Sequence, residues 1–164
     1  MPNPIRLLAV VIILLVAGGC SDADDRGSAT AAAELRECAP VGSELEEDAD
    51  VTVEVILDEY AFMPDALEVE AGIVTFEAEN VGEEEHELAF LPGGGEVPMD
   101  EEGLPDEDAL AEAGAFELEA FGPRQMCNAT YELEAGDYTV FCIVRAEDGG
   151  THLSKGMRGE LTVT

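Results

Sequence analysis

The sequence predicts an all-β protein, an antiparallel β-sandwich that is interrupted once by an acidic segment containing a short helix. After residue 50, short apolar runs alternate with polar residues, which is the period of a strand with one face buried. Turn residues separate these runs, as expected for antiparallel strands. One long acidic segment, 92–115, breaks the pattern and is interpreted as an insertion.

The strand pattern begins where Val51, Val53 and Val55 alternate with polar residues. Within the insertion, Pro105 and Gly114 bracket a stretch that predicts a short helix. Glycines at the ends of apolar runs mark the turns. The remaining strand-like segments are 66–72, 73–80, 86–90, 116–121, 130–136, 137–144 and 159–164.

The first 19 residues are predicted to be a signal peptide. Residues 1–19 carry one charge, Arg6, and an apolar run over 7–17 that ends in small residues. The run is too short to cross a bilayer comfortably, and it fits a secretory signal. The position of Cys20 directly after two glycines resembles the lipobox of bacterial lipoproteins, which implies a lipid on Cys20. An ordinary signal peptide cleaved elsewhere, with Cys20 incidental, is the alternative.

Residues 20–49 are predicted to be a tether between the lipid and a folded domain. They are rich in Ala, Asp, Glu, Gly and Ser and lack regular periodicity, apart from a short helix expected over 29–38. The domain itself is expected to span 50–164. These boundaries predict an exported protein of the bacterial cell envelope that reaches the membrane through its N-terminal lipid only.

The charge balance excludes nucleic-acid binding. Acidic residues number 38 against 7 basic ones, a formal net charge of −31. Binding to phosphate groups needs clustered Lys and Arg, which this chain lacks. The acidic surface also disfavours direct adsorption of the domain to anionic lipid. An acidic surface steers basic partners toward the protein, although a simple solvated surface accounts for the composition equally.

Two of the four cysteines are predicted to pair with each other. Cys20 is assigned to the lipid and Cys142 to a metal, which leaves Cys38 and Cys127. In an oxidising compartment spare cysteines form disulfides, so a bridge between them is expected. Two free thiols are the alternative.

The chain has only two histidines, and their spacing from a cysteine and a methionine suggests a metal site. His86 follows a strand-like run, and His152 lies ten residues after Cys142 and five before Met157. Two imidazoles, a thiolate and a weak axial thioether form the ligand set of a blue-copper electron-transfer centre. The predicted cofactor is therefore one copper ion that cycles between Cu(I) and Cu(II).

Two segments resemble the cupredoxin family of plastocyanin-like and azurin-like proteins, over about 50–164. Residues 60–90 resemble its F-x-P-x-x-L-x-V-x-A-G strand pair, N-x-G turn and first histidine ligand. Residues 136–163 resemble its cysteine strand, its H-x4-M half-motif and its closing strand.

The resemblance implies a Greek-key sandwich with His86, Cys142, His152 and Met157 as copper ligands. It further implies that Asn80 either supports a ligand from behind or supports the turn before the first ligand. In this family the exposed edge of the later histidine usually serves as the electron port, so His152 is expected to take that role.

One departure from the family pattern lies in the ligand loop. Nine residues, 143–151, separate Cys142 from His152, where the family usually has only a few. Gly149 and Gly150 make the loop bendable enough to bring His152 back, with the surplus residues as a surface bulge.

The acidic run 83–85, just before His86, has two interpretations. It either stabilises Cu(II) or forms a solvated turn.

These observations predict a lipid-anchored electron carrier whose redox partners bear basic patches. The alternatives are a copper-binding or copper-delivery lipoprotein that does not shuttle electrons, and a metal-free interaction domain. An enzyme is not expected, because multicopper oxidases need more than two histidines and no nucleophile–base pair, zinc motif or phosphate loop occurs.

Overall fold

The structure is a computed structural model that describes residues 34–37, 40–42, 45, 48–64 and 66–164. The chain divides into two units, 1–30 and 31–164, and every described residue belongs to the second. The signal peptide, Cys20 and Cys38 lie outside the described residues. Among the described residues, no helix is long and apolar enough to cross a membrane.

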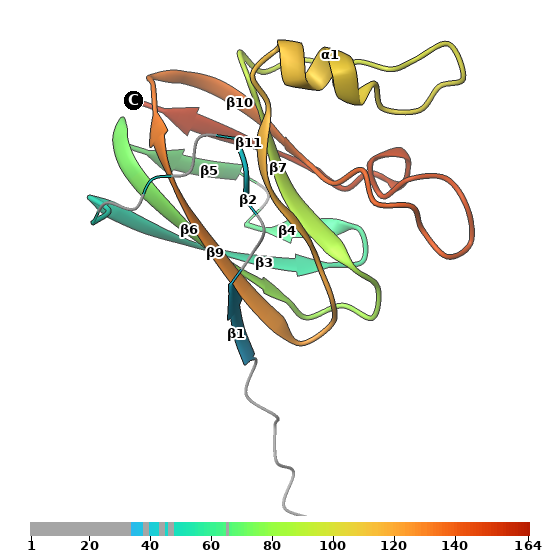
Figure 1. The fold of residues 1–164 in the computed structure, drawn as a ribbon, viewed down its shortest axis with the longest axis horizontal. Coiled ribbons are helices and arrows are strands. Elements are labelled where there is room, and N and C mark those ends of the chain that lie inside the picture. Colours follow the sequence, from blue (N-terminus) through green and yellow to red (C-terminus); the bar gives the residue numbers. More distant parts are fainter. Residues whose placement is uncertain (1–33, 38–39, 43–44, 46–47, 65) are drawn as a thin grey trace, which may run out of the picture. The chain divides into compact units, whose positions relative to one another are not determined.

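Two sheets pack face to face around one core, which confirms the predicted β-sandwich (Figure 1). The five-stranded sheet has the order β1 (Glu34–Glu37), β9 (Gln125–Leu133), β6 (Gly72–Asn80), β3 (Val51–Asp58) and β4 (Ala61–Met63). The six-stranded sheet has the order β2 (Pro40–Val41), β8 (Phe116–Phe121), β7 (His86–Pro92), β10 (Gly136–Phe141), β11 (Arg158–Val163) and β5 (Ala66–Val69).

Both sheets are mixed, which differs from the purely antiparallel arrangement expected. The strand pairs β3–β6, β5–β11 and β1–β9 run parallel, whereas the other pairs run antiparallel. Between β3 and β6 the chain forms β4 and then crosses to the other sheet as β5, so β6 returns in the direction of β3. Parallel neighbours require such a crossover, and local periodicity carries no information about it.

Strand periodicity builds the core between the sheets. In β6 the buried positions alternate, with Val74, Phe76 and Ala78 directed inward. Phe90 of β7 packs against Phe76 with ring centroids 4.4 Å apart and stacks on Phe116 at 4.9 Å. Such aromatic pairs each contribute about 0.5–1.5 kcal/mol beyond the area they bury. The two sheets are therefore joined at their centre by rings from three strands.

The acidic insertion forms the predicted helix, α1 (Glu107–Glu112), which covers the outer face of the six-stranded sheet. Asp106 caps its first turn by accepting the Ala109 N–H at 3.0 Å. Leu110 packs in a second cluster with Leu91 and Phe141, whose neighbours along the strands point into the main core. As a result, β7 is buried on both faces over most of its length.

The two N-terminal strands extend both sheets. β1 pairs with β9 and β2 pairs with β8, although both lie within the segment 20–49 assigned to the tether. The helix expected over 29–38 is wrong for Glu34–Glu37, because edge pairing with β9 overrides the local preference. Cys127 of β9 is buried and disulfide-bonded. Its pairing with Cys38 stays a prediction.

Candidate metal centre

The two sulfur and two imidazole side chains of the predicted set gather at one end of the sandwich. His86 opens β7, and Cys142 follows the last residue of β10. Because β7 and β10 are antiparallel neighbours, with Phe141 opposite Ala89, both side chains emerge close together. The loop between β10 and β11 supplies the other two (Figure 1).

Three potential metal donors converge at this end. The Nδ1 atoms of His86 and His152 are 2.9 Å apart, and Cys142 Sγ lies 3.4 Å from His152 Nδ1. One ligand atom from each of these three residues falls within 4.8 Å of the others. All three side chains have no exposed surface, and neither has Met157.

Backbone hydrogen bonds bring Met157 to the same place. The Cys142 N–H donates to the Met157 carbonyl at 3.3 Å, and the Met157 N–H donates to the His152 carbonyl at 2.9 Å. Met157 also belongs to the core cluster that contains Cys142. The four residues predicted as ligands are thus neighbours in the structure.

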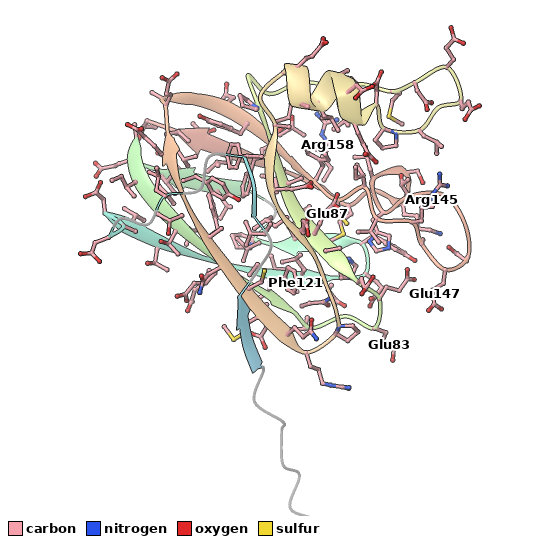
Figure 2. All side chains as sticks on the ribbon, in the orientation of Figure 1. Glu83, Glu87, Phe121, Arg145, Glu147 and Arg158 are labelled. Atoms are coloured by element: carbon pink, nitrogen blue, oxygen red, sulfur yellow. The ribbon has the colours of Figure 1, made fainter. Side chains whose placement is uncertain are left out.

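The long ligand loop folds outward and returns, as expected. The Ala146 N–H donates to the Gly150 carbonyl at 3.2 Å, and Gly149 and Gly150 have positive φ values of 101° and 79°. The His152 N–H then donates to the Val144 carbonyl at 2.8 Å, which closes the loop. The surplus residues form a surface bulge, on which Arg145 and Glu147 lie at the outer end of the molecule (Figure 2).

Glu59 holds the outer nitrogen of His86. Its Oε1 lies 3.3 Å from His86 Nε2 and accepts the N–H groups of Glu83 and Glu84 at 2.7 and 2.9 Å. Burial acts to raise the pKa of Glu59, but these hydrogen bonds outweigh it and lower the pKa to about 2. The carboxyl group is therefore ionised at neutral pH.

Glu84 holds the outer nitrogen of His152 in the same way. Its Oε2 lies 3.1 Å from His152 Nε2 and accepts the Glu147 N–H at 3.1 Å, while its Oε1 accepts the Tyr60 hydroxyl at 3.0 Å. Burial acts to raise the pKa of Glu84, and the hydrogen bond from His152 leads the contacts that lower it. Of the acidic run 83–85, only this residue turns toward the site, and the other two are exposed.

The two carboxylates determine which ring nitrogens carry protons. An ionised carboxylate only accepts hydrogen bonds, so Nε2 of each imidazole is the donor. Burial lowers the pKa of His86, which favours the neutral ring. In an imidazole that is protonated at Nε2 alone, the Nδ1 atom presents a lone pair. Both lone pairs meet beside the sulfur of Cys142, an arrangement that a bound cation satisfies.

The spacing of the donors fits a metal ion. Ligand nitrogens about 2.0 Å and sulfur about 2.3 Å from one ion lie about 3.5–3.8 Å apart in a trigonal plane. The Nδ1–Nδ1 separation of 2.9 Å and the Sγ–Nδ1 separation of 3.4 Å are shorter than this by about 0.6 and 0.3 Å, so a small outward shift of the side chains would make room for one ion. A β-carbon on Gly82 would collide with Glu59 and lie 2.9 Å from His86 Nε2, so the turn beside the site has no room for a side chain.

Cys142 is a poor nucleophile without a metal. Burial, reinforced by the nearby Glu87 carboxyl group, raises the pKa of the thiol to about 12. The Glu87 N–H points at the sulfur from 3.5 Å, as a donor to a thiolate would. A metal ion deprotonates a coordinating thiol outright, whereas a buried thiol alone is inert. The residue therefore suits metal binding better than covalent catalysis.

Asn80 supports the turn that carries Glu84. It has no exposed surface, and its amide donates to the carbonyls of Glu84 and Phe121 at 2.9 Å each. Its Oδ1 accepts the Gly82 N–H, also at 2.9 Å. These bonds tie the turn after β6 to the end of β8. The effect of Asn80 on a bound metal stays a prediction.

The expected exposure of His152 is wrong. Its ring is fully buried, with Tyr60 edge-on at a centroid distance of 5.0 Å and Glu84 across its outer nitrogen. Sequence reasoning missed Glu59 and Tyr60, which lie in the turn between β3 and β4. No motif marks them, because they reach the site only through the pairing of strands distant in sequence.

No family model matches the sequence, and no curated protein matches it. Among solved structures, the chain is similar to auracyanin B, with 24% identity over 77% of this chain and 98% of that one, and a TM-score of 0.60. A dithionite-reduced auracyanin from Roseiflexus castenholzii matches with 23% identity over 71% and 99% of the two chains, and a TM-score of 0.54.

Auracyanin A from Chloroflexus aurantiacus, described as a "blue" copper protein, matches with 21% identity over 69% of this chain and 98% of that one, and a TM-score of 0.50. Auracyanins are cupredoxins. The likeness in fold, together with the two mixed sheets, shows that this chain has the cupredoxin fold.

Proposed function

We propose that this protein is a blue-copper electron carrier with one copper ion held by His86, Cys142, His152 and Met157. The observation that carries the proposal is the buried convergence of two Nδ1 lone pairs on the Cys142 sulfur. The description of auracyanin A as a blue copper protein, on a similar fold, supports it.

The donor set selects copper by its chemistry. A soft thiolate with imidazoles and a weak thioether suits copper in both oxidation states. When bound, the ion supplies one-electron exchange between Cu(I) and Cu(II). The protein's own part is to hold the donors in nearly fixed positions, since β7 and β10 anchor two of them and the closed loop anchors the others.

Copper titration of the full-length chain, purified in detergent, tests the proposal. We expect an intense visible thiolate-to-copper band that saturates at one ion per chain, and no such band in Cys142→Ser. Met99→Leu, an exposed site outside the centre, is the matched control and should keep the band. A folded, colourless protein after copper addition would reject the proposal.

Electron carriage is favoured over copper delivery because the donors are enclosed. All four side chains lack exposed surface, so an acceptor has no direct access to the ion's ligands. Fast, reversible Cu(II)/Cu(I) voltammetry is therefore expected. Ready transfer of copper to a chelating acceptor would instead favour delivery. We infer no enzymatic role, and a metal-free interaction domain would tolerate Cys142→Ser without loss of function.

We further propose that the carrier is exported and lipid-anchored, with 1–19 as signal peptide, Cys20 as the lipidated residue and 20–49 leading to the domain. Its redox partners are proteins with basic patches, because the chain has a formal net charge of −31. Cys20→Ser should move the protein from the membrane fraction to the soluble exported fraction. Unchanged fractionation would reject the anchor.

A further inference from the structure

The outer edge of His152 is closed by a carboxylate instead of being open to solvent. Glu84 Oε2 lies 3.1 Å from His152 Nε2, and the Glu84 side chain is only 16% exposed. Tyr60 covers the ring beside it and is itself covered by Lys155, whose Nζ lies 5.1 Å from the Tyr60 ring centroid. Solvent and partners therefore do not reach the imidazole directly.

The Glu84 carboxylate is fixed from two separate segments. The Tyr60 hydroxyl reaches Oε1 from the turn after β3, and the Glu147 N–H reaches Oε2 from the ligand loop. Its backbone is held as well, since its N–H donates to Glu59 and its carbonyl accepts from Asn80. So many independent contacts give the carboxylate one defined position relative to the ring.

We propose that Glu84 is a positioning residue of the centre, which fixes His152 as its Nε2–H tautomer and seals its outer edge. The copper part of this inference rests on the proposed function. The hydrogen bond itself exists without a metal and can be tested without one.

The charge of Glu84 has a consequence for the bound ion. A carboxylate that accepts the outer N–H of a ligating imidazole raises the basicity of the ring, and stabilises the more positive metal state. Removing this charge is expected to raise the reduction potential. A purely structural role, in which Glu84 only ties down the loop through Glu147, would not produce this shift in an isosteric variant.

The first experiment follows imidazole nitrogens and ring protons by proton–nitrogen NMR on the metal-free, full-length chain in detergent. We expect the Nε2–H tautomer at His152, with ring-proton exchange about ten- to a hundredfold slower than in Glu84→Ala, since hydrogen bonds to charged groups have that strength. Glu85→Gln, which removes an exposed charge from the same turn, should match the parent. An Nδ1–H tautomer, or equal exchange in parent and Glu84→Ala, would overturn the inference.

The second experiment measures the reduction potential of the copper-loaded chain. Glu84→Gln keeps the side-chain shape and should raise the potential more than Glu85→Gln, which controls for the lost charge. Tyr60→Phe removes the hydroxyl that donates to Glu84 Oε1, so the Glu84 carboxylate is held less firmly. It should give a smaller shift in potential of the same sign. Equal shifts in the two glutamine variants would overturn the positioning role. If the chain binds no copper, the proposed function fails while the NMR result still decides the fate of Glu84.

Discussion

The two halves of the centre are held by different kinds of structure. His86 and Cys142 emerge from β7 and β10, antiparallel neighbours whose register fixes the distance between them. His152 and Met157 lie in and after a loop held by turn hydrogen bonds and by one carboxylate. The sandwich therefore determines where the site is, whereas local contacts determine how His152 and Met157 are held.

If the sandwich determines where the site is, a cavity in its core should lower the free energy of unfolding more than any other change. Phe90→Ala empties the centre of the sandwich between Phe76 and Phe116, and should lower the free energy of unfolding by about 3–5 kcal/mol. Urea unfolding of the copper-free protein measures it. Val81→Ala, at an exposed position, should change stability by less than about 0.5 kcal/mol. Comparable losses in both would contradict the account.

Asn80 ties the turn that carries Glu84 to the end of β8, so its removal should affect binding and stability together. Asn80→Ala leaves buried carbonyl groups without donors, which costs about 1–3 kcal/mol of stability. Copper affinity should fall about 10–100-fold, as for other residues that orient ligands. Competition titration with a copper chelator checks this, with Asn128→Ala in β9 as the control. Unchanged affinity in Asn80→Ala would show that the turn does not support the site.

Strain in the ligand loop should weaken binding and leave the sandwich intact. Gly150 has φ of 79°, and a β-carbon there would lie 2.7 Å from Ser154 Oγ. Gly150→Ala should lower copper affinity by about tenfold, since an alanine in this conformation costs roughly 1–2 kcal/mol. Gly103→Ala is a matched control, with the same φ of 79° but open space around it. A loss of affinity shared by both variants would argue against a specific role of the loop.

The smallest effect concerns pH and a carboxyl group outside the proposed ligand set. Burial, together with Glu119 and Glu107, raises the pKa of Glu117 in the folded state. Its contribution to stability is full below the unfolded pKa and is lost as pH rises through the folded one. Glu117→Gln should therefore gain stability relative to the parent as pH rises above the ordinary glutamate pKa of 4.5. Thermal unfolding of the metal-free protein measures it, with exposed Glu160→Gln as control. The same trend in Glu160→Gln would contradict the assignment.

The strands and the candidate ligands could be predicted because their signals are local. Alternation marks β6, and the spacing of Cys142, His152 and Met157 marks the loop. The parallel pairing of β3 with β6 could not, because direction depends on a crossover that leaves no periodic trace.

The environment of the ligands was equally inaccessible from the sequence. Burial of His152 depends on Tyr60, a residue in a different turn, and on a bulge whose folding follows from two glycine dihedrals. The role of Glu84 within an acidic run of three could not be separated from that of its exposed neighbours by composition. Such contacts exist only once strands distant in sequence have paired.

The convergence of two imidazoles and one thiol on a single ion is tested most directly by X-ray absorption at the copper edge of the loaded, full-length chain. We expect a first coordination shell with two nitrogens and one short sulfur bond, and loss of that sulfur in Cys142→Ser. A shell made only of oxygen and nitrogen in the folded parent protein would contradict it.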